Sequence, residues 1–186
     1  SIVVPGFQRS KETLSNISIE LSRRGIVTIA IDPYAQGLSS SSFSRRAATK
    51  EGYGMFSLVD YIYDTSILNY VDKDKIGVTG HSAGGLAAMR AAQYFGKLAN
   101  KNNTKSKIHS VFVSGMLRMG FKEKDLKNIE SNVGVSYALY DEGAWQNELK
   151  HGSLEYAPEI LRLIYLQSEK EKKISKVEMG KYYGSL

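Results

Sequence analysis

A serine between two closely spaced glycines is the feature of this sequence best suited to chemistry. Ser82 lies in the segment 80–85 (GHSAGG), which follows the short apolar run 76–79 and precedes an alanine-rich stretch. The spacing Gly80-x-Ser82-x-Gly84 is that of a nucleophile elbow, in which a strand turns directly into a helix at the serine. Such a turn holds the serine in a strained left-handed conformation and requires small residues two positions away on either side. The pattern predicts a serine nucleophile for acyl transfer, with the helix N-terminus favouring developing negative charge.

Other interpretations of the same glycines stay open. A glycine-rich turn between strand and helix can bind phosphate, but Leu86-Ala87 stand where a phosphate-binding loop has Lys and Ser or Thr. The turn is also similar to that of short-chain dehydrogenases, although Leu86 replaces their last glycine and no Tyr is followed four residues later by Lys. Finally, the glycines could serve only the close packing of a helix on a sheet.

The elements that must position Ser82 alternate between strand and helix along the chain. Short β-branched runs indicate strands, and apolar residues spaced three and four apart indicate helices. This alternation is typical of an α/β protein, here a three-layer α/β/α sandwich with a mostly parallel central sheet. We expect one domain over 1–186, with strands at 2–4, 26–31, 76–79, 109–114 and 133–140, helices at about 11–24, 55–68, 86–95 and 154–172, and loops at 36–44 and 100–107.

Three motifs in this order resemble the α/β-hydrolase superfamily, nearest to its dienelactone-hydrolase, cutinase-like and acetylhydrolase-like serine esterases. The elbow is one of them. Residues 3–7 (VVPGF) resemble the strand and turn that supply half of the family's oxyanion hole, and 31–37 (IDPYAQG) resemble the next strand and a loop beside the substrate cleft. The resemblance covers about 1–143. It implies a serine hydrolase that acts on carboxylic esters through an acyl-enzyme, without a metal or an organic cofactor.

The resemblance implies a role for each residue that matches a family motif. Ser82 corresponds to the nucleophile, and the backbone N–H groups of Phe7 and Ala83 correspond to the two oxyanion donors. In this family the acid follows a later strand, which indicates Asp141 at the end of the strand 133–140, with the adjacent Glu142 as the alternative acid. Two further acidic residues lie in a charged connection that we expect to be exposed: Glu123 and Asp125.

The histidine base has no equally clear candidate. His81 adjoins Ser82 in the elbow, where neighbouring side chains point in different directions, and His109 precedes the acid rather than following it. His151 follows Asp141 by ten positions, whereas another helix and strand separate acid and base in the family. We therefore expect the base beyond Leu186 in a longer protein, with His151 as the alternative candidate.

The two ends of the chain also indicate a piece of a longer protein. The family has further strands before the strand at 2–4, and a strand and helix after the helix at 154–172. Because a serine without a base is a poor nucleophile, a second hypothesis is a non-catalytic binding module that keeps the hydrolase fold. Without the last strand, the sheet would have an exposed edge, which favours association into oligomers.

Composition bears on the remaining classes of function. Lys and Arg number 25 against 19 Asp and Glu, a net charge of +6 that is not gathered into basic blocks, so we expect a small ester or acyl substrate and no nucleic-acid partner. The absence of cysteine excludes disulfides, cysteine nucleophiles and thiolate metal sites.

No apolar run approaches the roughly 18 residues of a membrane span, and no secretion signal is recognised, which favours a cytoplasmic location while leaving the compartment open. Four aromatic residues are candidates for either a cleft or the core: Tyr34, Tyr53, Phe56 and Trp145.

Overall fold

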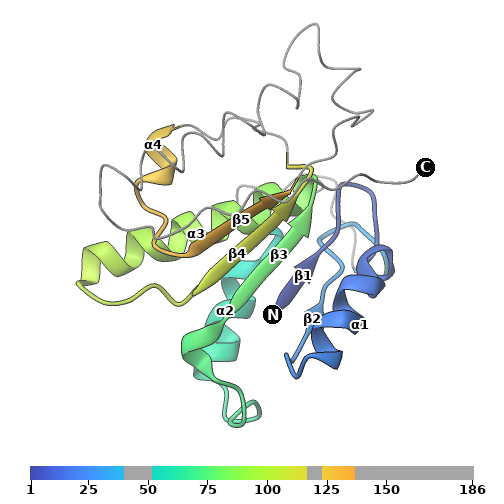
Figure 1. Ribbon diagram of the computed structural model, residues 1–186, viewed down its shortest axis with the longest axis horizontal. Coiled ribbons are helices and arrows are strands. Elements are labelled where there is room, and N and C mark those ends of the chain that lie inside the picture. The colour runs from blue at the N-terminus through green and yellow to red at the C-terminus, as the bar shows by residue number, and fades with distance from the viewer. Residues whose placement is uncertain (40–51, 117–122, 137–186) are drawn as a thin grey trace, which may run out of the picture.

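A parallel sheet forms the centre of the computed structural model, which describes residues 1–39, 52–116 and 123–136 (Figure 1). The five described strands lie in the order β2-β1-β3-β4-β5, and every neighbouring pair is parallel. Their bounds are Ile2–Val4 for β1, Ile29–Ala30 for β2, Gly77–His81 for β3, Ser110–Ser114 for β4 and Asn132–Ser136 for β5. The predicted parallel sheet is therefore confirmed.

Helices lie on both faces of this sheet. The described helices are α1 (Ser15–Arg23), α2 (Met55–Asp64), α3 (Ala83–Asn102) and α4 (Glu123–Leu126), with short 3-10 helices at Lys11–Leu14 and Lys73–Lys75. Along the sheet, β2 lies on one side of β1, whereas β4 lies on the opposite side of β3. Because crossovers between parallel strands are right-handed, the helices in these two connections, α1 and α3, lie on opposite faces of the sheet. Figure 1 shows α2 and α3 together behind the sheet and α1 beside β2. This is the predicted three-layer arrangement.

The helix α3 packs closely against the middle of the sheet because its inner residues are small. Ala87, Ala88, Ala91 and Ala92 are all fully buried. The helix continues beyond the predicted span 86–95 to Asn102. The next residue, Asn103, has a left-handed φ of 52°, and the Thr104 N–H donates to the Ala99 carbonyl. The predicted loop at 100–107 was therefore placed a few residues too early.

The predicted strand at 26–31 is wrong in length, since β2 comprises only Ile29–Ala30. The helix α1 ends at Arg23, Gly25 just beyond it has a φ of +80°, and the N–H of Ile26 donates to the Leu21 carbonyl across the end of the helix. This is the hydrogen bonding of a Schellman motif, so the backbone of Ile26 serves the helix end instead of the sheet. Ile26 and Val27 are accordingly 40% exposed.

The connection before β5 is also different from the prediction, because it contains α4 and packs on α3. Asp125, which we expected to be exposed, accepts hydrogen bonds from Gln93 Nε2 at 2.8 Å and from Arg90 Nη1 at 3.2 Å. Leu126 is buried beside it. A glycine at position 96 permits this contact, because a Cβ there would lie 1.6 Å from the Asn128 carbonyl oxygen.

Some predicted elements lie partly or wholly outside the described residues, among them the loop expected at 36–44, which is described only as far as Ser39. The strand expected at 133–140 is described only as far as Ser136, and the helix expected at 154–172 is not described. Among the helices that the structure does describe, none combines the length and the apolar character needed to cross a bilayer.

Candidate active site

Ser82 occupies the predicted sharp turn between a strand and a helix. The strand β3 ends at His81 and α3 begins at Ala83, so the serine is the single residue between them. Its φ of 53° and ψ of −119° lie in a sparsely populated region, which costs about 1–3 kcal/mol and persists only where the surroundings enforce it. Here the N–H of Ser82 donates to the Ser114 carbonyl at 2.9 Å, and its carbonyl accepts from Leu86 N–H at 3.1 Å.

The two glycines of the motif are required by contacts between backbones. A Cβ at Gly80 would lie 2.4 Å from the carbonyl carbon of Gly84, and a Cβ at Gly84 would lie 2.3 Å from the carbonyl oxygen of Val4. The first turn of α3 therefore packs directly against both β3 and the end of β1. The glycine spacing that identified the elbow in the sequence has this steric cause.

The turn after β1 lies next to the elbow. The pairing of Val4 with Gly80 brings the ends of β1 and β3 to the same edge of the sheet. A Cβ at Gly6 would lie 3.4 Å from the Cβ of Ser82, which places this residue in contact distance of the serine. Phe7 follows Gly6 and its side chain is 44% exposed. The two predicted oxyanion residues, Phe7 and Ala83, thus come from segments that flank Ser82.

This turn has its own strained residue. The N–H of Arg9 donates to the Gly6 carbonyl at 3.2 Å, which closes a four-residue turn. Its third residue, Gln8, has a φ of 59°, a left-handed conformation that is uncommon for a residue other than glycine. Contacts from outside the turn must hold it in this form.

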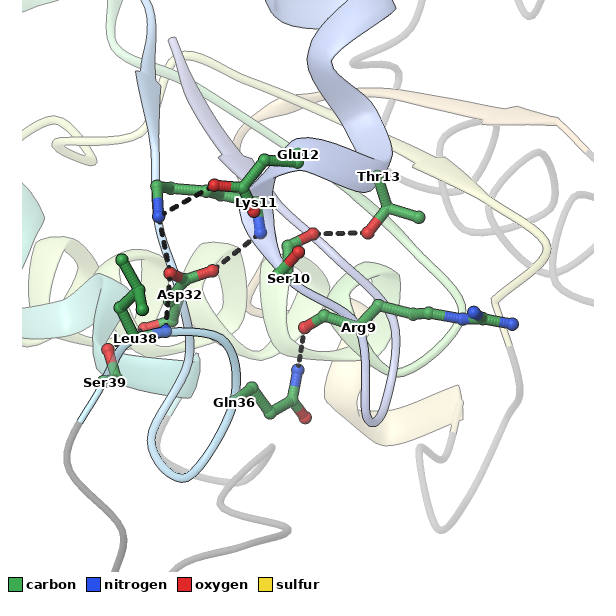
Figure 2. Close-up of polar contacts among 9 residues, drawn as sticks. All are labelled: Arg9, Ser10, Lys11, Glu12, Thr13, Asp32, Gln36, Leu38 and Ser39. Carbon is green, nitrogen blue, oxygen red and sulfur yellow. Dashed lines mark hydrogen bonds and ion pairs between the residues drawn. The ribbon is translucent and has the colours of Figure 1, made fainter.

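Gln36 supplies those contacts. Its side chain is only 4% exposed, and its amide nitrogen Nε2 donates to the carbonyl oxygens of Gly6 at 2.9 Å and Arg9 at 2.7 Å. Its amide oxygen Oε1 accepts from the N–H of Gln8 at 3.0 Å. The Gln36–Arg9 bond is drawn in Figure 2. Sequence reasoning placed Gln36 only in a loop, and nothing in the residue pattern signals these long-range bonds.

Asp32 ties the same two segments together at a second point (Figure 2). Its carboxylate accepts from the backbone N–H of Lys11 at 2.7 Å, from Lys11 Nζ at 2.7 Å and from the N–H of Leu38 at 3.1 Å. The Lys11 N–H is one of the unpaired donors at the start of a helix, so Asp32 caps the 3-10 turn Lys11–Leu14 from a distant segment. The loop 32–39 is thereby fixed to the beginning of the 3-10 helix.

The electrostatics of Asp32 follow from these contacts. Burial of its carboxyl group would raise the pKa, but the hydrogen bonds from the side chain and backbone of Lys11 and from Leu38 outweigh burial, so the pKa of Asp32 lies below its ordinary value. The pKa of Lys11 is raised, chiefly by its hydrogen bond to Asp32 and then by that to Glu12. Asp32 is therefore a structural anion at neutral pH.

The arrangement of turn, elbow and helix has a counterpart among known protein families. The sequence profile of the alpha/beta hydrolase family matches residues 2–168. The chain belongs to this family. Membership supports a hydrolase function in general terms and agrees with the predicted resemblance.

Solved structures of other proteins are similar to this α/β-hydrolase. A protein from Lactobacillus plantarum WCFS1, provisionally assigned as a carboxylesterase, aligns over 99% of this chain and 74% of its own, with 16% sequence identity and a TM-score of 0.54. The structure of DcsB in complex with its substrate analogue aligns over 62% of this chain and 36% of its own, with 24% identity and a TM-score of 0.49. The chain thus spans about a third of DcsB. No curated protein sequence matches it.

The structure does not test the other predicted site residues of this α/β-hydrolase. Asp141, Glu142 and His151 lie outside the described residues. His81 is exposed at the end of β3, and its Nδ1 would lie 3.4 Å from a Cβ at Gly6. His109 is exposed at the opposite end of the sheet, immediately before β4, with Nε2 3.4 Å from the side-chain nitrogen of Asn132.

Two of the four aromatic residues that could line a cleft belong to the core instead. Tyr53 is 3% exposed, and burial raises the pKa of its hydroxyl. Phe56 stacks on Tyr94 with ring centroids 4.3 Å apart. Tyr34 is 39% exposed in the loop that carries Gln36, and Trp145 lies outside the described residues.

Across 1–39, 52–116 and 123–136, no group of three or more His, Asp or Glu side chains is arranged to hold a metal ion.

Proposed function

We propose that this α/β-hydrolase hydrolyses carboxylic esters with Ser82 as its nucleophile. The observation that carries the proposal is the strained backbone of Ser82 between β3 and α3, with φ 53° and ψ −119°. Strain of this kind is concentrated at functional sites, and the backbone contacts of Gly80 and Gly84 enforce it here. Ser82 is half-buried, so its side chain is not sealed inside the core.

The proposed reaction proceeds through an acyl-enzyme. The Ser82 hydroxyl attacks the carbonyl carbon of the ester while a base takes its proton, and the negative charge moves to the carbonyl oxygen. The N–H groups of Phe7 and Ala83 are proposed to stabilise that oxyanion. The C–O bond then breaks, the alcohol leaves with the proton, and water hydrolyses the acyl-serine to release the carboxylic acid and the free hydroxyl group.

The mechanism also needs an acid and a base, and the residues assigned to these two roles are predictions from the sequence. Asp141, or the adjacent Glu142, is proposed as the acid that orients the histidine, and His151 is the alternative candidate for the base. Single alanine variants at these three positions test the assignments. The variant of a working base should lose about as much activity as the variant of the nucleophile, because such groups act as one unit.

Labelling with a fluorophosphonate probe tests the nucleophile. The wild-type protein should be labelled and should hydrolyse short p-nitrophenyl esters, while Ser82→Ala should lose labelling and roughly 1,000-fold or more in kcat/KM. Ser57→Ala, an exposed serine on α2, is the matched control and should behave as wild type. A folded wild-type protein that is neither labelled nor active would contradict the proposal and favour a non-catalytic binding module with the hydrolase fold.

A further inference from the structure

Resting on the proposed function, we propose that Gln36 is a positioning residue that sets the direction of the Phe7 N–H in the oxyanion hole. Gln36 has no role in the reaction sequence itself. It acts through the turn formed by residues 6–9, which it binds from the neighbouring loop.

The Gly6 carbonyl and the Phe7 N–H belong to one planar group. Peptide bonds are planar, and the described chain contains no cis peptide, so the N–H of Phe7 points in the direction opposite to the carbonyl of Gly6. Gln36 Nε2 donates to that carbonyl oxygen at 2.9 Å. A side chain that fixes the direction of the carbonyl therefore also fixes the direction of the N–H on its other side.

The other two bonds of Gln36 oppose any rotation of this peptide. The amide holds the carbonyl of Arg9 at 2.7 Å and the N–H of Gln8 at 3.0 Å, so one planar group contacts three backbone groups of the turn. Gln8 is the residue with the left-handed φ of 59°, and its strain would be relieved if the turn relaxed. Both N–H donors of the amide and its acceptor oxygen are used, and no other side chain offers two donors and an acceptor in the same geometry.

Gln36 is itself held rigidly enough to act in this way. Its side chain is 4% exposed, its N–H donates to the Pro33 carbonyl at 2.9 Å, and its carbonyl accepts from Ser39 N–H at 3.1 Å. The Asp32 carboxylate closes the loop 32–39 by accepting a hydrogen bond from Leu38 N–H at 3.1 Å. Its bonds to Lys11 fix the same loop to the 3-10 helix that follows the turn 6–9 (Figure 2). Precise orientation of an oxyanion donor requires a support of this kind.

The variant Gln36→Leu tests the proposal, since it replaces the amide by an apolar side chain of comparable size and removes all three bonds. We expect kcat for a p-nitrophenyl ester to fall about 10- to 100-fold, less than the loss on deleting an oxyanion donor outright. KM should change by no more than about threefold, because the misdirected N–H acts mainly on the transition state. Gln93→Leu is the matched control: Gln93 is also buried, at 6% exposure, but binds Asp125. It should keep wild-type kcat.

A thionoester separates this role from a general loss of structure. Sulfur is a larger and weaker hydrogen-bond acceptor than oxygen, so a well-aimed N–H favours the ester over its thionoester. Loss of folded protein lowers both rates equally and leaves their ratio unchanged. Gln36→Leu should reduce the ester-to-thionoester ratio of kcat/KM about tenfold, whereas Gln93→Leu should leave it at the wild-type value.

A second variant, Gln36→Glu, keeps the side-chain shape should Gln36→Leu fail to fold. At neutral pH its carboxylate would face the carbonyls of Gly6 and Arg9, which are both acceptors, whereas a protonated carboxyl group could donate to one of them. The ratio of variant to wild-type kcat should therefore rise as the pH is lowered from about 8 to about 5.5. Wild-type protein that is labelled at Ser82, combined with unchanged kcat and unchanged substrate ratio in both variants, would overturn the role of Gln36 alone. Wild-type protein that is not labelled would overturn the proposed function and this inference together.

Discussion

Asp32 illustrates at the scale of a single residue how one carboxylate can hold two segments together. Its side chain is 6% exposed and accepts two backbone N–H groups and one ammonium group. Glycine at position 37 is part of this arrangement, because its φ is +53° and a Cβ there would lie 2.3 Å from the Asp32 carboxyl carbon. The backbone of the loop 32–39 therefore packs closely around the Asp32 carboxylate, and the stability of the loop should depend on the charge of that carboxylate.

Asp32→Asn should lower the free energy of unfolding by about 2 kcal/mol near neutral pH, since hydrogen bonds to a charged group are lost. The pKa of Asp32 is depressed in the folded state, so this stabilisation is fully present above the ordinary carboxyl pKa of 3.8 and is lost as the pH falls below that value. Urea unfolding of both proteins over this range measures the difference. Asp60→Asn is the control: its carboxylate binds Lys107 but is 46% exposed, so the effect should be below about 1 kcal/mol. A difference for Asp32 that persisted unchanged at about pH 2 would argue against this role.

The elbow illustrates, at the scale of elements, how three of them meet through backbone alone. The end of β1, the end of β3 and the first turn of α3 approach so closely that Gly80 and Gly84 leave no room for a Cβ. Side-chain packing cannot adjust to a clash with backbone atoms. The cost of an added methyl group should therefore be larger here than at a glycine needed only for its φ angle.

Gly84→Ala should destabilise the protein by about 3 kcal/mol or more, because overpacking against the carbonyls of Val4 and Pro5 forces the elements apart. It should also abolish fluorophosphonate labelling. Gly25→Ala provides the comparison: its φ is +80° but nothing lies within 4 Å of the added Cβ, so only backbone strain of about 1 kcal/mol is expected. Thermal and urea unfolding of the two variants give the comparison. Equal losses in the free energy of unfolding would mean that the clash with backbone atoms at Gly84 adds nothing to the cost of the substitution.

The elements differ in how far the sequence could predict them. The elbow was predictable because its steric requirement falls on residues two positions apart, Gly80, Ser82 and Gly84, and so is visible locally. The short β2 was not, because the β-branched residues at 26–31 have the propensity of a strand while the end of α1 takes the N–H of Ile26. Gln36 and Asp125 were missed for a related reason, since their partners lie far away in the sequence and loop glutamines and aspartates carry no periodic signal.

At the scale of the molecule, the helices on the two faces of the sheet are packed unequally in the part of the chain that the structure describes. On one face, α3 has thirteen buried residues, which pack against the sheet, α2 and the connection that contains α4. On the other, α1 has no buried residue, and its apolar side chains are only partly covered by the described residues. Stability is therefore distributed unevenly, and the part of the fold that carries Ser82 belongs to the better-packed face.

Hydrogen exchange of the native protein should reflect this difference. Amides in α3 and β3 should exchange only through global unfolding, whereas those in α1 should exchange through local opening of lower free energy. Mass spectrometry of peptides covering Ser15–Arg23 and Ala83–Asn102 measures both. Equal protection in the two helices would show that α1 is coupled to the core by contacts beyond its own buried surface.

The Schellman motif that shortens β2 also limits what this side of the sheet offers to another chain. Among the described strands, β2 stands at the border and pairs only with β1, through Ile29 and Ala30. The segment before it is committed to the end of a helix, and Pro33 shortly after it has no N–H. The described part of β2 therefore offers a further strand few backbone donors and acceptors, and short strands of this kind limit unwanted sheet extension.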